Sequence, residues 1–100
     1  MVNVRVVVLY RSNSEHERSV LEFEHEYTRR TNRSLQLSDI NTRDGASMAT
    51  LYDIMQYPCV LALANDGQMI QMWQGEHLPL INEVTYYDQQ PAFAMEATNW

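Results

Sequence analysis

Cysteine is almost absent from the sequence: Cys59 is the only one among 100 residues. A single thiol excludes an internal disulfide framework, and one cysteine with three scattered histidines gives no zinc-binding pattern. We therefore expect neither a bound metal nor a cofactor. The scarcity of cysteine is also typical of the reducing cytoplasm, which is the location that the sequence favours.

Positive charge is scarce as well. Lysine is missing, and the seven basic residues are all arginines against thirteen acids, so the formal net charge is -6. A negatively charged chain repels the phosphate backbone, which argues against a nucleic-acid partner. The densest basic group is Arg29, Arg30 and Arg33. We assign it to the end of a helix, where the negative end of the helix dipole favours cations.

Long hydrophobic runs are missing too. The apolar run near the N-terminus covers only 6–9, and no stretch approaches the roughly 20 apolar residues of a membrane span. We therefore expect no membrane partner. A chain of 100 residues that is 45% hydrophobic predicts one globular domain, which we place at 1–87. The apolar pattern stops at Asp88, so we expect 88–100 to be a mobile tail.

What the sequence does contain is a regular alternation of strand and helix patterns. These patterns predict strands over 4–10, 34–40, 59–64 and 68–74, and helices over 15–30, from about 48 to before Pro58, and from Pro79 to about 87. The Asn-Asp-Gly turn at 65–67 joins the last two strands in a hairpin. The order β-α-β-α-β-β-α predicts an α/β fold in three layers, α/β/α.

Two local patterns specify the helices further. Ser14 and Glu17 have the spacing of a capping box, which predicts that Ser14 caps the first long helix. In the second helix, Met48, Leu51, Tyr52 and Met55 are spaced i, i+3, i+4 and i+7, which predicts that this face is buried.

The spacing of one stretch is similar to that of the thioredoxin-like superfamily. The stretch reads Ala49-x-x-Tyr52-x-Ile54-x-x-Tyr57-Pro58, an apolar strand, Asp66-Gly67, a strand, and Gly75. The resemblance implies a four-stranded mixed sheet in the order 4-3-1-2, with the third strand antiparallel. It also implies that Pro58 is a cis proline that faces the redox site of the family.

The redox cysteines of that family stand at the start of the first long helix, where the resemblance places Ser14-Glu15-His16-Glu17. Neither cysteine is present. Because a serine hydroxyl cannot exchange with disulfides, the chain is not expected to be a dithiol-disulfide oxidoreductase. Whether it is an enzyme of another kind stays open at this point.

The groove that the family uses to hold a substrate strand remains the candidate site. The resemblance brings five residues there: Tyr10, Ser14, Tyr57, Pro58 and Cys59. The leading hypothesis is a non-catalytic module that binds a protein or peptide partner, or a homodimer through the edge strand 68–74. The alternative is a single-thiol enzyme or redox sensor that uses Cys59, although a cysteine that begins an apolar strand is more simply a buried core residue.

Overall fold

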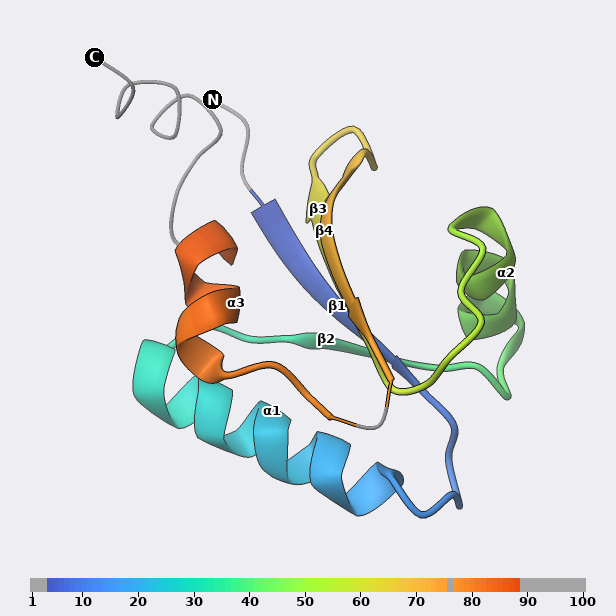
Figure 1. Ribbon diagram of the computed structural model, residues 1–100, viewed down its shortest axis with the longest axis horizontal. Helices are drawn as coiled ribbons and strands as arrows, with labels where there is room; N and C mark the ends of the chain where they lie inside the picture. The colour runs from blue at the N-terminus through green and yellow to red at the C-terminus, as the bar shows by residue number, and fades with distance from the viewer. Residues whose placement is uncertain (1–3, 76, 89–100) are drawn as a thin grey trace.

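The sheet carries helices on both of its faces in the computed structural model, which describes residues 4–75 and 77–88 (Figure 1). The elements are β1 (Val4–Tyr10), α1 (Glu17–Thr31), β2 (Gln36–Asp39), α2 (Arg43–Leu51), β3 (Cys59–Ala64), β4 (Met69–Gln74) and α3 (Ile81–Asp88). No helix in this part of the chain is long and apolar enough to cross a membrane.

The four strands lie in the order β2-β1-β3-β4. β1 pairs with β2 in parallel and with β3 antiparallel, and β4 pairs with β3 antiparallel. This is the predicted order 4-3-1-2 read from the other edge, with the third strand antiparallel as expected. With helices on both faces of this sheet, the predicted three-layer α/β/α fold is confirmed.

Alternation along β1 divides the core into two. Val6 and Val8 face one side of the sheet, where they pack with Val20 of α1 and Val84 of α3. Their neighbours, Val7 and Leu9, face the other side together with Ala49 of α2. Figure 1 shows the same division, with α1 and α3 on one face and α2 on the other. Because successive side chains of a strand point to opposite faces, a continuous apolar strand needs cover on both.

Several residues of the stretch that carries the resemblance have a structural role. Ala49 and Ile54 are 9% and 5% exposed in the core on the α2 side. The Tyr52 hydroxyl donates to the carbonyl oxygen of Gly67 at 2.6 Å, which ties the end of α2 to the turn between β3 and β4. Gly67 adopts φ +89, a conformation in which glycine carries no steric cost.

The predicted capping box at the start of α1 is wrong. α1 begins at Glu17 rather than near Glu15, and its N-cap residue is His16, which makes no side-chain cap bond. The Ser14 hydroxyl donates to the carbonyl oxygen of Arg11 at 2.6 Å, and Glu17 accepts from the Asn13 backbone N–H at 3.1 Å. Asn13 has φ +62, so the chain turns once more before the helix begins, and Ser14 stabilises that turn instead.

The predicted buried face of α2 is also wrong in part. Gly45 and Ala49 are the buried residues of the helix, whereas Leu51 is 74% and Met55 is 77% exposed. α2 ends at Leu51, which lies about 200° around the helix axis from Ala49. Leu51 therefore points away from the sheet, and Met55 lies beyond the helix.

α2 begins at Arg43, about five residues before the expected start near 48, and the other boundaries differ by one or two residues from the sequence pattern. β2 covers Gln36–Asp39 rather than 34–40, and β4 begins at Met69. α3 begins at Ile81, two residues after Pro79, with the Leu80 N–H donating to Glu83 Oε1 at 2.9 Å. Asp88 is the last residue of α3, and the rest of the expected tail, 89–100, lies outside the described residues.

Gly45 gives a test of how closely α2 approaches the sheet. A Cβ at this position would overlap the Asp39 carbonyl oxygen and lie 3.0 Å from the Cα of Ile40. Replacing a helical glycine by alanine normally stabilises by up to about 1 kcal/mol. Here we expect Gly45→Ala to destabilise by about 1–3 kcal/mol, because backbone atoms must move to make room. Urea unfolding measures the change.

The control for that experiment is Ser47→Ala, at an exposed position of the same helix, which we expect to change the free energy of unfolding by less than about 0.5 kcal/mol. A Gly45→Ala variant more stable than the wild type would contradict the close packing of α2 against β2.

Candidate functional site

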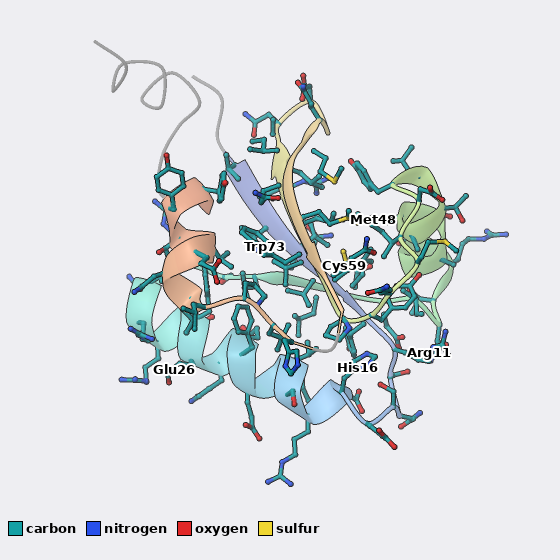
Figure 2. The ribbon with its side chains drawn as sticks, viewed as in Figure 1. Arg11, His16, Glu26, Met48, Cys59 and Trp73 are labelled. Carbon is teal, nitrogen blue, oxygen red and sulfur yellow. The ribbon has the colours of Figure 1, made fainter. Side chains whose placement is uncertain are left out.

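A shallow cleft of about 340 Å³ lies between the start of α1 and the residue that precedes Pro58. Its lining residues are Arg11, Ser14, Glu15, His16 and Tyr57. The first four belong to the connection from β1 to α1, and Figure 2 shows Arg11 and His16 on this connection. The fifth, Tyr57, comes from the connection between α2 and β3. The cleft therefore forms where two segments distant in sequence meet at one end of the sheet.

A hydrogen-bonded carboxylate holds the β1–α1 connection in place. Asp39 Oδ1 accepts from the backbone N–H groups of Ser12 at 3.1 Å and Asn41 at 2.9 Å. The Asn41 side-chain amide in turn donates to Ser12 Oγ at 3.0 Å. Hydrogen bonds from Ser12 and Asn41 lower the pKa of the Asp39 carboxyl below its ordinary value of 3.8. The end of β2 thus fixes the loop that carries most of the cleft.

His16 is held neutral in the wall of the cleft. Its Nε2 atom accepts a hydrogen bond from the Arg11 backbone N–H at 3.0 Å, which requires an unprotonated Nε2. Burial and the positive charge of Arg11 lower the pKa of His16 below the ordinary 6.5, although Glu17 acts in the opposite direction. At neutral pH the imidazole therefore adds no positive charge to the cleft.

The other wall is the Tyr57-Pro58 pair, whose peptide bond is cis. Tyr57 is half-buried, and its hydroxyl donates to the carbonyl oxygen of Ile54 at 3.3 Å. Pro58 is fully buried, and its carbonyl oxygen accepts from the Gly75 N–H at 3.2 Å. The Pro58 carbonyl is therefore already used within the fold. Among the hydrogen bonds of the described residues, none uses the backbone N–H or C=O of Tyr57.

The structure brings only two of the five predicted site residues, Ser14 and Tyr57, into the lining of the cleft. Pro58 and Cys59 are fully buried and do not line it. Tyr10 is half-buried against the core on the side of α1 and α3, and burial, with smaller contributions from Asp39 and Glu17, raises its pKa above 10.0.

Sequence reasoning missed Arg11, Glu15 and His16 as lining residues. The position of Arg11 directly after an apolar strand was an available signal, because residues at strand ends often line sites. The contact between its backbone N–H and the His16 ring depends on the turn at Asn13, which no sequence pattern indicated.

Cys59 is fully buried, and desolvation raises the pKa of its thiol to about 12. The thiolate is the reactive form of cysteine, so this thiol is held in its unreactive state near neutral pH. No group of three or more His, Cys, Asp or Glu residues suited to a metal ion occurs within the described ranges 4–75 and 77–88.

A second hollow, of about 350 Å³, lies on the other side of Tyr57. It is mostly apolar and is lined by Ile40, Ala46, Ala49, Thr50, Asp53, Ile54, Met55 and Tyr57. Tyr57 thus separates a polar cleft at the start of α1 from an apolar hollow beside α2.

The state of His16 predicts a pH dependence of stability. Because folding lowers its pKa, the unfolded chain binds the proton more tightly, and stability rises with pH below the ordinary value of 6.5. This contribution is complete above about pH 6.5 and is lost as the pH falls toward the folded pKa. We expect the free energy of unfolding to fall more between about pH 7.5 and about pH 5.5 in the wild type than in His16→Gln, which does not titrate.

The matched control is His25→Gln, which removes an exposed imidazole from α1. Urea unfolding at each pH measures the free energies, and an NMR titration of the ring protons gives the pKa of His16 directly. A His16 pKa at or above 6.5 in the folded protein would disprove the assignment.

The single buried thiol predicts that the protein lacks dithiol activity. We expect no reduction of insulin by a thiol recycling system above the rate without protein, because one thiol cannot complete the exchange cycle. Turbidity of the reduced insulin chains measures the rate. Turnover that persists in Cys59→Ser would contradict our description of the site, and turnover abolished by that change would favour the single-thiol alternative.

No family model matches the chain, and no curated protein matches it. Solved structures do match. Thioredoxin 1 from Thermosipho africanus has a TM-score of 0.62 at 12% identity and covers 96% of this chain and 99% of its own. Mitochondrial thioredoxin 3 from Saccharomyces cerevisiae has a TM-score of 0.64 at 11% identity, over 87% of this chain and 77% of its own.

Thioredoxin-2 of the malaria parasite gives a TM-score of 0.63 at 15% identity, over 85% of this chain and 80% of its own. Identities this low show a shared fold. They do not carry over an activity, because one fold hosts many functions. The protein therefore has the thioredoxin-like fold and lacks the Cys-x-x-Cys motif.

Proposed function

We propose that this protein is a non-catalytic binding module that holds an extended segment of a protein partner against Tyr57. The observation that carries the proposal is the open cleft between the start of α1 and Tyr57. The sequence has no cysteine pair that could give this cleft a redox activity, so binding is the simpler role. The only thiol is buried with a pKa of about 12. What the cleft can offer is contact and hydrogen bonding.

The backbone of Tyr57 supports the binding of an extended chain. Its N–H and C=O take part in no hydrogen bond among the described residues, so both are available to an incoming strand. Main-chain pairing of this kind supplies affinity with little demand on sequence. The Pro58 carbonyl is used by Gly75, so the pairing is confined to Tyr57 itself.

The surroundings of Tyr57 supply selectivity. On the side of α1 the partner meets Arg11 and Glu15, and on the side of α2 it meets the apolar hollow beside Met55. Met55 is 77% exposed, and exposed large apolar side chains next to a hollow are a feature of interaction sites. We therefore propose a partner segment that places an apolar side chain against Met55 and polar groups against Arg11 and Glu15.

The two other candidates have less support. A homodimer through β4 is a variant of the binding proposal, because among the described strands β4 pairs only with β3 and leaves its other edge unpaired. A single-thiol enzyme or sensor would need Cys59 to ionise, and its burial and raised pKa oppose this. A cytoplasmic location is part of the proposal and rests on the single cysteine.

The proposal is tested with a peptide selected from a displayed random library and titrated into the ¹⁵N-labelled protein. We expect chemical-shift changes at Arg11, His16 and Tyr57, and Tyr57→Ala to lose at least about 1 kcal/mol of binding free energy, as anchoring aromatics commonly do. Tyr57→Phe retains the ring and loses only the bond to Ile54. It should therefore bind nearly as the wild type does.

The control variant is Arg30→Ala, on an exposed part of α1 away from the cleft. Melting temperatures of all three variants separate lost binding from lost folding. Shift changes confined to 68–74 or to residues beyond Asp88 would show that the cleft is not the binding surface.

A further inference from the structure

A third hollow, of about 260 Å³, lies between β4 and α3, away from the Tyr57 cleft. Its lining residues are Gln71, Trp73, Glu83, Tyr86 and Tyr87. Pockets for small molecules usually measure roughly 300–1,000 Å³, so this hollow is too small and shallow to enclose one. It suits a surface contact with a chain better. We call it the aromatic cleft.

Three aromatic rings stand edge to face along the aromatic cleft. Trp73 of β4 and Tyr87 of α3 have ring centroids 5.6 Å apart at 69°, and Tyr86 and Tyr87 lie 5.0 Å apart at 87°. Figure 2 shows Trp73 on the side of the sheet that faces α3. Rings at nearly right angles leave notches between a face and an edge. A flat, rigid, apolar ring such as that of proline fits such notches.

The aromatic cleft also carries hydrogen-bond donors. The Tyr87 hydroxyl accepts from Gln71 Nε2 at 3.1 Å, which leaves its own proton for another acceptor. The indole N–H of Trp73 makes no hydrogen bond among the described residues, and none of their buried side-chain polar atoms lacks a partner. The indole N–H is therefore not completely buried. A polyproline II helix presents backbone carbonyls with no internal partners, which are acceptors for these two donors.

One negative charge stands in the aromatic cleft. Glu83 is exposed, and its Oε1 atom accepts from the Leu80 N–H at 2.9 Å, which fixes the carboxylate at the start of α3. Its Oε2 atom takes part in no hydrogen bond or ion pair among the described residues. A chain with net charge -6 and a fixed carboxylate in this cleft attracts a cationic partner.

We propose that the aromatic cleft is a second docking surface, which binds a proline-rich segment of a partner protein in the polyproline II conformation with an arginine beside it. The prolines pack against Trp73, Tyr86 and Tyr87, and the arginine pairs with Glu83. The surface is separate from the Tyr57 cleft, so it stands whether or not that cleft binds a partner.

The test uses the full chain and three synthetic peptides. The first is acetyl-Arg-Ala-Leu-Pro-Pro-Leu-Pro-amide, the second has alanine in place of every proline, and the third has glutamine in place of arginine. We expect the first peptide to shift the Trp73 indole and Tyr86 signals in a saturable way, and the alanine peptide to bind at least fivefold more weakly. Tyr86→Ala should weaken the first peptide at least fivefold with little change in melting temperature, because Tyr86 is 52% exposed.

The charge is tested separately with Glu83→Gln, which keeps an acceptor for the Leu80 N–H. We expect this variant to bind the arginine peptide more weakly than the wild type does and the glutamine peptide equally well. Equal binding of the proline and alanine peptides would overturn the proposal, as would shifts that avoid Trp73. A wild-type dimer that Tyr86→Ala converts to a monomer would also overturn it, because a second copy would then be the occupant.

Discussion

The fold depends on the pairing of β1 with β3, two strands that are buried on both faces. Every residue of β3 is buried, and Val6, Val7, Val8 and Leu9 of β1 are at most 2% exposed. A strand pair without a polar side cannot lie at the surface of a two-layer domain, so helices must cover both faces. α1 and α3 do so on one side and α2 on the other. The edge positions then fall to β2 and β4, which are only partly buried.

The same pairing also creates the Tyr57 cleft. The register sets Leu9 opposite Cys59, so the residues just after β1 and just before β3 leave the sheet at the same end. Arg11 and Tyr57 meet there for this reason. The loop that carries Arg11 is held by Asp39, which lies opposite Tyr10 in the parallel pairing of β1 with β2. The ends of β1, β2 and β3 are adjacent in the sheet, so the sheet sets the position of the cleft although loop residues line it.

Chemistry in this cleft is limited by what the start of α1 contains. The N-terminus of a helix lowers the pKa of a cysteine placed there, which is how such a position becomes reactive. Here the residues that lead into α1 are Ser14, Glu15 and His16, and the helix begins at Glu17. Ser14 is engaged with a backbone carbonyl and His16 with a backbone N–H. Both side chains therefore stabilise the turn into α1.

Apolar periodicity in the sequence predicted the strands, because side-chain alternation is a local property, and the single cysteine excludes a Cys-x-x-Cys motif. The order of the strands in the sheet followed from the resemblance to a known fold. The sequence placed Ser14 opposite Tyr57 only through the same resemblance. The tertiary structure decided which face of α2 is buried: Gly45 and Ala49 contact the sheet, although Leu51 and Met55 are larger and more apolar. It also decided that Ser14 stabilises the turn before α1 rather than capping the helix, and that His16 lines the cleft. Such contacts depend on how closely two elements approach and where a loop turns, and these distances are set by the packing of the whole domain rather than by neighbouring residues.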